Sequence, residues 1–463
     1  MTTGERAEQM RPAWDAPPSL GIRERTRGSL SARLDSLDGR SVVLVESDPF
    51  LRRGALTCAD GEKLAAAARL ALQRRVPLVL LLASSGADVY EGLPALHGWG
   101  RAARAMVSCS GVVPVLMAVD GPAVSGPALL LGLADHVIMT SDAYAFVSGP
   151  AMVRDFTGEG VSNQVLGGAH VHGRHTGTAA AVVADAESAR VALAELIRYL
   201  PDHTDEPPPT VATDDPWERP TPEAGELLPE APTGSYDVRA VASAVVDDGE
   251  MLEVRPGWAP NLVTGLASLG GRPVGIVANQ PQAIAGTLDI PASQKGARFV
   301  AFCDAFNLPI VTLVDTPGFY PGKDLEWRGM IRHGAQLAFA YARATVPRLC
   351  VAVRKSYGGA YIVMDSRHMG NDLYVAWPCA EIAVMGAGQA SAILMRGAGA
   401  EERADFQADY AERLLNPYVA AMRGSVDAVI DPADTRRVLC AALDKLQAKR
   451  EALPGRKHDN SPL

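Results

Sequence analysis

Runs of apolar residues bounded by glycine and proline recur along the chain and predict buried parallel strands. The segments 76–83 (VPLVLLLA) and 308–315 (LPIVTLVD) show no alternation of polar and apolar positions, as expected for strands covered by helices on both faces of a sheet. Each follows a stretch with helical character, 60–73 (DGEKLAAAARLALQ) and 293–306 (SQKGARFVAFCDAF). This order of helix and strand predicts an α/β fold with crossover helices.

The same unit occurs twice, which predicts an internal duplication. Pro77 and Pro309 are 232 residues apart, and Gly126 and Gly359 are 233 residues apart. A repeat of this length is a whole domain rather than a solenoid unit. We therefore expect two tandem α/β domains with functional sites at the strand ends.

Composition divides the chain into four parts. The stretch 201–232 contains nine prolines, nine acidic residues and one arginine, a composition that stiffens a connection and buries little apolar surface. We predict a linker at 201–234 that joins an N-terminal domain at 39–200 to a C-terminal domain at 235–463. Residues 1–38 show little periodicity and are expected to form a poorly ordered tail.

Net charge, apolar run length and cysteine content exclude several classes of protein. The net charge is −9 and the sequence has no long Lys/Arg stripe, so a nucleic-acid binder is not expected. No apolar run approaches the roughly 18 residues that span a bilayer, so we expect no membrane segment. The six cysteines form no CxxC pair, which argues against a zinc cluster or a disulfide framework and favours the cytoplasm.

Two glycine-containing turns are the strongest candidates for chemistry. Each follows an apolar strand and precedes an apolar helical stretch: Ser125-Gly126 in the first repeat and Gly358-Gly359-Ala360 in the second. Amides at such a helix start have no helical partner, so they can form an oxyanion hole. Alternatively, the glycines only permit tight turns. Their matching positions favour the first interpretation, and two holes predict group transfer between enolate-like or ureide-like species.

Other motifs give weaker signals. His170, His172 and His175 could bind a metal, but no nearby acidic residue or cysteine completes the set, so we predict a polar loop without metal. Asp315 closes a buried strand and is expected to bond a turn. The segment 386–391 (GAGQAS) lacks the third glycine of a dinucleotide fingerprint, and the sequence has neither a P-loop nor a GxSxG motif. The sequence therefore gives no support for ATP binding, NAD binding or a serine hydrolase.

Longer motifs resemble one known family, the carboxyltransferase (β) subunits of biotin-dependent acyl-CoA carboxylases of the propionyl-CoA and acetyl-CoA carboxylase type. The resemblance is dense from about residue 235 onward and looser before it, where 61–65 (GEKLA) and 145–177 match. The C-terminal motifs are GEMLEVRPGWAPNLVTG, GIVANQPQAIAGTLDIPASQKGARFVAFCDAFNLPIVTLVDTPGFYPG, IRHGAQLAFAYARATVP, RKSYGGAYIVM, LYVAWPCAEIAVMGA, NPYVAAMRGSVDAVIDPADTR and KHDNSPL.

The resemblance implies two tandem crotonase-like (ClpP/crotonase) domains in a ring-shaped homo-hexamer. Its active site would lie where the N-terminal domain of one subunit, which takes the acyl-CoA, meets the C-terminal domain of another, which takes carboxybiotin. In this match Gly359 and Ala360 hold the biotin carbonyl oxygen, and Ser125 and Gly126 hold the thioester oxygen. The implied substrate-binding positions are Gly149, Gly358, Tyr361, Ile362 and Gly386.

The implied function is transfer of CO2 from carboxybiotin to the α carbon of a short acyl-CoA through an enolate, giving a malonyl-CoA or methylmalonyl-CoA type product. Biotin would arrive on a biotin carboxylase/biotin carboxyl carrier (α) subunit, because the chain has neither the Met-Lys-Met pattern of a biotinyl carrier nor an ATP loop. Coenzyme A enters as part of the substrate, and no metal or side-chain base is needed.

Three positions differ from the family pattern. The family has a Gly-Gly-Ala turn where this chain has Ser125-Gly126-Pro127, and proline has no N–H to donate. Asp88 stands where the family has an arginine. Ile362 stands where an aspartate often lines the acyl pocket, which implies a different or broader acyl preference that includes acetyl-CoA.

Two alternative functions are compatible with the same sequence. A decarboxylase or transcarboxylase of this fold would take CO2 from a malonyl-type thioester, and the sequence does not give the direction of flux. A non-catalytic scaffold subunit would assemble the ring through its C-terminal domain, with an N-terminal domain altered at Asp88 and Pro127.

Overall fold

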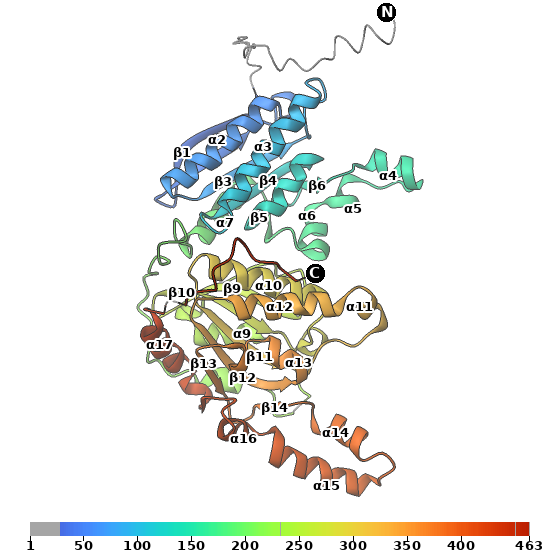
Figure 1. Ribbon diagram of the computed structural model, residues 1–463, viewed down its shortest axis with the longest axis vertical. Helices are drawn as coiled ribbons and strands as arrows, with labels where there is room; N and C mark the ends of the chain where they lie inside the picture. The colour runs from blue at the N-terminus through green and yellow to red at the C-terminus, as the bar shows by residue number, and fades with distance from the viewer. Residues whose placement is uncertain (1–27, 232, 450, 463) are drawn as a thin grey trace, which may run out of the picture.

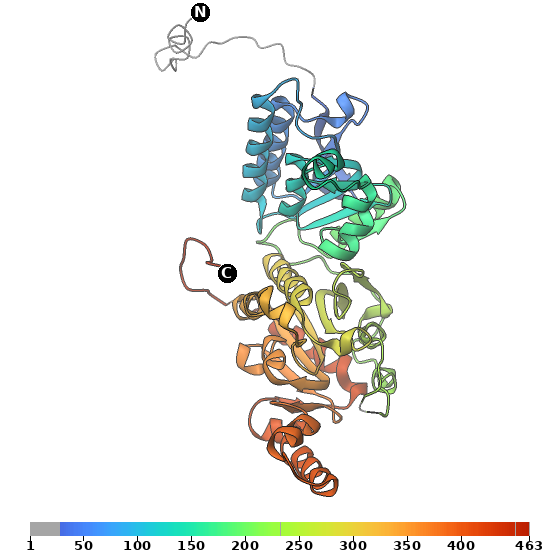
Figure 2. The same ribbon diagram turned by 90° about the vertical axis from the view of Figure 1, so that its right-hand side faces the viewer.

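The chain folds into two α/β halves stacked along the long axis of the molecule (Figures 1 and 2). The computed structural model describes residues 28–231, 233–449 and 451–462, so most of the predicted tail, 1–27, lies outside the described residues. Each half is built on a predominantly parallel sheet with helices on both faces. The predicted α/β fold is confirmed.

The N-terminal sheet has the strand order β1-β2-β3-β4-β5-β7, and β6 pairs with the end of β4. All these pairs are parallel except β1 with β2. The strands are β1 (Leu30–Leu37), β2 (Arg40–Ser47), β3 (Leu78–Ser84), β4 (Val115–Val124), β5 (His136–Thr140), β6 (Tyr144–Phe146) and β7 (Ala181–Val183). The helices are α2 (Cys58–Arg74), α3 (Leu93–Cys109), the 3-10 helix η2 (Gly126–Leu133), α4 (Pro150–Thr157), α5 (Asn163–Gly167), α6 (Ala169–Val171) and α7 (Ala186–Arg198).

Alternating strand residues bury both faces of this sheet. Val43 and Leu78 pack under α2 and α3, whereas Val79 faces α7 on the other side. Helix α2 begins with a capping box, in which the Thr57 hydroxyl accepts the Asp60 amide and the Asp60 carboxylate accepts the Thr57 amide. The long helix predicted from its alanine and leucine spacing therefore has a defined start.

Strand β1 corrects the predicted boundary of the tail. Leu30–Leu37 falls inside the range 1–38, yet it pairs along its whole length with β2 in an antiparallel hairpin. Only Leu30 of this strand is buried, so the apolar run that marks the inner strands is missing. Backbone pairing rather than burial forms β1, and the N-terminal sheet therefore starts before residue 39.

The C-terminal sheet has the strand order β15-β13-β12-β11-β10-β9-β8, and β14 pairs with the end of β12. Its strands are β8 (Met251–Glu253), β9 (Leu262–Leu269), β10 (Arg272–Asn279), β11 (Ile310–Thr316), β12 (Arg348–Tyr357), β13 (Leu373–Ala376), β14 (Glu381–Ala383) and β15 (Ala428–Val429). Its helices include α9 (Val238–Val245), α10 (Ile290–Ala305), α11 (Lys323–Trp327), α12 (Met330–Arg343), α13 (Gly358–Val363), α14 (Ala387–Leu394), α15 (Ala400–Tyr410), the π-helix η7 (Ala411–Leu415), α16 (Pro417–Met422) and α17 (Thr435–Leu446).

Strand by strand, the C-terminal sheet repeats the N-terminal one. The orders β2-β3-β4-β5-β7 and β10-β11-β12-β13-β15 correspond, and the short strands β6 and β14 pair with the ends of β4 and β12. The chain leaves β4 and β12 through residues with nearly the same positive φ, 62° at Ser125 and 60° at Gly358. The predicted duplication is confirmed.

Much of the predicted linker is docked on the C-terminal half. It contains the short helix α8 (Pro222–Glu226). The Thr221 amide donates to the Ala433 carbonyl at 2.9 Å. Arg436 of α17, which is fully buried, donates to the Pro216 carbonyl at 3.0 Å. The acidic, proline-rich segment therefore runs along the surface of the C-terminal half, where hydrogen bonds hold it.

A continuous apolar core and several polar contacts join the two halves. The buried His136 of β5 meets Phe302 of α10 edge-on, with ring centroids 4.4 Å apart. Arg298 of α10 reaches Asp135 at 3.2 Å and also donates to the carbonyl that precedes it. The orientation of the halves is thus fixed by side chains from both.

Candidate active site

The turn after β12 carries the two amides that are predicted to form the C-terminal oxyanion hole. Gly358 leaves the buried strand with φ 60°, a conformation that favours glycine. A Cβ there would lie 3.2 Å from the Val384 carbonyl oxygen. Gly359 and Ala360 are the second and third residues of α13. Their amides therefore have no carbonyl acceptor within the helix. Two neighbouring amides can thus point at one ligand oxygen.

The turn after β4 has the same backbone path but fewer donors. The Ser125 amide donates to the Phe146 carbonyl at 2.9 Å, within the pairing of β4 and β6. Gly126 is the first residue of η2, so its amide has no acceptor within that helix. Pro127 has no N–H to donate. Of the two amides predicted for the N-terminal hole, that of Gly126 can still face a ligand.

Trp99 of α3 covers Gly126, a contact that the sequence pattern did not reveal. A Cβ at position 126 would lie 2.7 Å from Trp99 Nε1, so only glycine fits beneath the indole ring. The buried indole N–H has no hydrogen-bond partner among the described residues. Close packing therefore adds a second reason for glycine at this turn.

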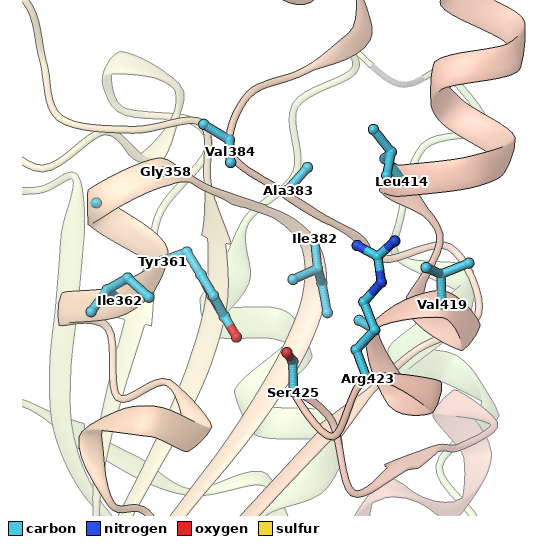
Figure 3. Close-up of a pocket in the computed structure, with 12 residues that line it drawn as sticks. Gly358, Tyr361, Ile362, Ile382, Ala383, Val384, Leu414, Val419, Arg423 and Ser425 are labelled. Atoms are coloured by element: carbon cyan, nitrogen blue, oxygen red, sulfur yellow. The ribbon is translucent and has the colours of Figure 1, made fainter.

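A cavity of about 420 Å³ lies on one side of α13 (Figure 3). Its polar side chains are Tyr361, Arg423 and Ser425, and the rest of the lining is glycine or apolar. The Tyr361 hydroxyl is buried without a hydrogen-bond partner in the described part of the chain, and burial raises the pKa of Tyr361 to about 12. This phenol therefore stays protonated at neutral pH. The lining residues are Gly358, Gly359, Tyr361, Ile362, Ile382, Ala383, Val384, Leu414, Val419, Ala420, Arg423 and Ser425.

A second cavity, of about 490 Å³, lies on the other side of α13. Gly359 and Ile362 line both cavities. In the second cavity they face Phe319 and the side of α12 that carries Gly334 and Ala338. Ile362 is 38% exposed, so its side chain borders open space next to the candidate amides.

Comparison with known proteins shows the family of this chain. The carboxyl transferase domain family matches residues 19–461. The propionyl-CoA carboxylase β chain of Saccharopolyspora erythraea is 42% identical over 447 residues, which span 92% of this chain and 82% of that protein. This chain belongs to the carboxyl transferase family. The methylmalonyl-CoA carboxyltransferase 12S subunit of Propionibacterium freudenreichii subsp. shermanii is likewise 42% identical over 430 residues, or 92% of this carboxyltransferase and 82% of that subunit.

Solved structures share the fold of this carboxyltransferase. The transcarboxylase 12S hexamer crystallised with hydrolyzed methylmalonyl-coenzyme A aligns with a TM-score of 0.92 at 40% identity, covering 94% of this chain and 85% of that one. A single-chain, multi-domain long-chain acyl-CoA carboxylase aligns with a TM-score of 0.78 at 28% identity, covering 90% and 41%. The predicted pair of crotonase-like domains and the carboxyltransferase function are confirmed.

Asp88, which departs from the family pattern, is neutralised within the carboxyltransferase. It is 4% exposed and pairs with Arg52 at 2.7 Å. Its other carboxylate oxygen accepts the Tyr90 amide at 2.9 Å. The acidic side chain therefore stabilises a local turn and adds no unpaired charge to the N-terminal half.

Gly149 and Gly386 occupy equivalent places, at the N-caps of α4 and α14. A Cβ would lie 3.3 Å from the Phe146 ring at Gly149 and 3.1 Å from the Tyr357 ring at Gly386. Neither glycine lines the two cavities around α13. Close packing against an aromatic ring accounts for both, and their predicted contact with substrate stays a prediction.

The histidine cluster lies in the short helices α6 (Ala169–Val171) and η3 (His172–Thr176), so the predicted loop is wrong, and His172 forms local hydrogen bonds. The two ring nitrogens of His172 lie 2.9 Å from the Thr176 hydroxyl and 2.8 Å from the Ala145 carbonyl. In the described ranges no group of three His, Cys, Asp or Glu side chains is arranged to hold a metal ion. Across those same residues, no helix has both the length and the apolar character needed to cross a bilayer.

Arg423 and Ser425 are site residues that periodicity and spacing did not predict. They follow α16, more than sixty positions after Gly359, and the fold brings them to the same cavity. The only signal in the sequence was the family motif NPYVAAMRGSVDAVIDPADTR that contains them.

Proposed function

We propose that this carboxyltransferase moves CO2 from carboxybiotin on a partner carrier to the α carbon of a short acyl-CoA. In this proposal the amides of Gly359 and Ala360 bind the biotin carbonyl oxygen and the Gly126 amide binds the thioester oxygen. Ser125 acts as the turn residue that places Gly126. The observation that carries the proposal is the C-terminal turn, where neighbouring amides adjoin a cavity that also contains the unpartnered Tyr361 hydroxyl.

The residues around α13 fit a planar ureide. Gly358 and Gly359 place no side chain between the helix and the cavity, and the Tyr361 phenol offers a donor. Carboxybiotin supplies the carboxyl group: its N–C bond breaks, the ureide nitrogen accepts the α-proton of the thioester, and the enolate carbon forms a bond to CO2. The amide donors stabilise the developing oxyanions, so no side-chain base is required, and loss of one such donor reduces the rate by about 100- to 1000-fold.

We propose that Ile362 contacts the acyl group. Its position on the border of both cavities and its partly exposed aliphatic side chain support this role. An apolar contact discriminates weakly between acyl groups that differ by one methylene. The difference in transition-state binding free energy is about 1 to 3 kcal/mol. This proposal therefore includes acetyl-CoA, propionyl-CoA and butyryl-CoA as substrates.

A biotin-carrying α subunit and a homo-hexamer complete the proposal. Among the described residues, none from the N-terminal half lines either cavity around α13, which supports an active site completed by the N-terminal half of another subunit. The similar proteins are described as β chains and as a hexamer. All six cysteines, which lie within the described residues, are free thiols, and this supports a reducing cytoplasm.

A transcarboxylase is the second candidate, because the methylmalonyl-CoA carboxyltransferase 12S subunit is as similar as the carboxylase chains. The backbone donors would serve both directions of transfer. The partner decides between them: a carrier that is carboxylated with ATP supports the carboxylase, and one that is charged by a malonyl-type thioester supports the transcarboxylase.

The test is a reconstitution with defined parts. The purified chain is combined with acetyl-, propionyl- or butyryl-CoA, labelled bicarbonate and ATP, with or without a biotinylated carrier and its biotin carboxylase. We expect label in the acyl-CoA only when both partner activities are present, and no covalent biotin on this chain in a streptavidin blot. Covalent biotin on this chain, or ATP-dependent carboxylation without a partner, would contradict the proposal. Absence of transfer to every acyl-CoA with an active carrier would instead support the scaffold alternative.

A further inference from the structure

The N-terminal turn has one backbone donor fewer than its C-terminal counterpart. Gly126 and Pro127 take the places that Gly359 and Ala360 take in the second repeat, directly after the residue with positive φ. Gly126, Gly359 and Ala360 each keep an N–H, but Pro127 has none. The C-terminal turn therefore offers two adjacent amides, and the N-terminal turn offers one.

A tryptophan lies against the turn that lacks the amide, and a phenylalanine lies against the other. Trp99 Nε1 is 2.7 Å and Cε2 is 2.8 Å from the position of a Cβ at Gly126. The ring of Phe319 is 3.5 Å from the same position at Gly359. Of these two rings only the indole has a donor. A side-chain N–H is thus found beside the glycine of the turn that has lost a backbone N–H.

Close contact between two helices fixes the position of Trp99. It follows Gly98 in α3, which lies beside α2 (Figures 1 and 2). A Cβ at Gly98 would lie 2.7 Å from the Cys58 α carbon, and one at Gly61 would lie 2.0 Å from the Gly98 carbonyl carbon. The two backbones therefore touch directly and hold α3 in place. A donor that is fixed in advance stabilises developing charge without reorganisation.

The indole nitrogen of Trp99 is a buried donor. Nε1 has no hydrogen-bond partner among the residues that the structure describes, and a buried donor without an acceptor lowers stability. An indole is also a neutral group that only donates, so it can face an oxygen that is neutral in the substrate and negative in the transition state. These properties point to an acceptor that arrives with the substrate.

We propose that the Trp99 indole N–H is the second donor to the thioester oxygen, in place of the amide that Pro127 lacks. The inference rests on the proposed function, which assigns this oxygen to the Gly126 amide. As the ureide nitrogen accepts the α-proton, negative charge moves onto the thioester oxygen, and a second donor stabilises this oxyanion more than the neutral carbonyl. Trp99 therefore acts on the rate of carboxyl transfer more than on the binding of the acyl-CoA.

The test exchanges one donor for the other. Trp99→Phe keeps an aromatic ring over Gly126 and removes the N–H, so we expect kcat for transfer from carboxylated carrier to propionyl-CoA to fall about 100-fold with little change in KM for propionyl-CoA. Adding Pro127→Ala to this variant supplies a backbone amide at the place that Ala360 takes in the second repeat. We expect the double variant to regain about tenfold in kcat.

A second tryptophan provides the matched control. Trp217→Phe removes an indole N–H from a side chain that is 43% exposed and belongs to the linker, so it should transfer carboxyl at the wild-type rate. Size-exclusion chromatography of all variants checks assembly.

Ligand binding gives a readout that does not depend on turnover. Calorimetric titration compares propionyl-CoA with S-propyl-CoA, a thioether that lacks the carbonyl oxygen. We expect the wild type to bind the thioester about 2- to 10-fold more tightly. Trp99→Phe should lose part of this preference while its affinity for S-propyl-CoA is unchanged, which a general loss of structure would not produce.

The outcomes separate the role of Trp99 from the proposed function. A wild-type kcat in assembled Trp99→Phe would overturn the role of Trp99 and leave the proposed function intact. A loss of kcat that Pro127→Ala fails to restore, or a thioester preference that is equal in Trp99→Phe and the wild type, would also overturn the donor role. A wild type that transfers no carboxyl from an active carrier would contradict the proposed function itself, and the thioester preference would still test Trp99.

Discussion

At the scale of single residues, Ser125 is held in a backbone conformation that suits glycine. Its φ of 62° and ψ of −139° lie outside the ordinary regions for a residue with a Cβ. Two hydrogen bonds hold it there: its amide donates to the Phe146 carbonyl, and its carbonyl accepts the Ala128 amide at 3.0 Å. The equivalent residue of the second repeat, Gly358, adopts nearly the same φ without this strain.

Replacement of Ser125 by glycine should stabilise the protein. Removing the Cβ relieves backbone strain in the folded protein, and this effect outweighs the greater conformational entropy that glycine gives the unfolded chain. We therefore expect the free energy of unfolding to rise by about 1 kcal/mol and carboxyl transfer to be retained. Thermal unfolding of Ser125→Gly should show a rise in Tm of about 1 °C, given the size of the chain. Ser125→Ala keeps the Cβ and serves as the control. Equal Tm values for Ser125→Gly and the wild type would show that this turn stores no strain.

Ala360 tests the amide assignment. Ala360→Pro deletes one N–H in the first turn of α13, where proline is compatible with a helix, so we expect kcat to fall by about 100- to 1000-fold. Ala360→Ser keeps the amide and should retain most of the activity. Size-exclusion chromatography of both variants checks assembly. An assembled Ala360→Pro protein that transfers carboxyl at the wild-type rate would remove Ala360 from the list of donors.

At the scale of elements, a buried ion pair ties the beginning of β12 to the end of α13. Arg348, the first residue of β12, pairs with Asp365, which follows α13, and both side chains are at most 2% exposed. Arg348 also donates to the Gly370 carbonyl at 2.6 Å. Because the strand and the helix between these residues carry the candidate amides, the pair fixes the orientation of the turn at Gly358.

Removing either partner of this pair leaves the other charge buried. Asp365→Asn and Arg348→Met should each reduce the free energy of unfolding by about 3 to 5 kcal/mol. The double variant should lose less than the sum of the single losses, by about 2 kcal/mol. Urea unfolding of the wild type, the two single variants and the double variant gives a double-mutant cycle for the pair. Strictly additive losses would show that the two side chains do not act together.

The sequence predicted the elements with strong periodicity and missed those formed by partners distant in sequence. The stretch 60–73 predicts α2 because its alanines and leucines follow helical spacing, and 308–315 predicts β11 because it is apolar on both faces. Strand β1 has a mostly exposed surface, so no apolar pattern marks it. The bond from Ser125 to Phe146 and the approach of Arg423 to α13 depend on tertiary contacts that no local pattern encodes.

At the scale of the whole molecule, the contact between the halves contains a buried histidine. His136 is 1% exposed, packs against Phe302, and has no hydrogen-bond partner for either ring nitrogen among the described residues. Burial lowers the pKa of His136 well below its usual value, and Arg255 and Arg298 act in the same direction. The imidazole is therefore neutral in the folded protein.

This histidine should make the protein sensitive to acid. Below about pH 6.5 the unfolded chain binds a proton at His136 that the folded chain excludes, so the free energy of unfolding falls as the pH is lowered. His136→Met should reduce the drop in Tm between about pH 7.5 and about pH 5.5. His97→Gln, at an exposed position, is the control. The same drop in His136→Met and the wild type would assign acid sensitivity to other groups.

The docked linker has a consequence for the order in which the protein matures. The Pro216 carbonyl receives its hydrogen bond from Arg436, 220 positions later in the chain. During translation Pro216 leaves the ribosome well before α17 is made, so this contact forms late in synthesis. A polypeptide truncated before α17 would lack this hydrogen bond, so we expect limited proteolysis to cut it near Pro216 sooner than the whole chain.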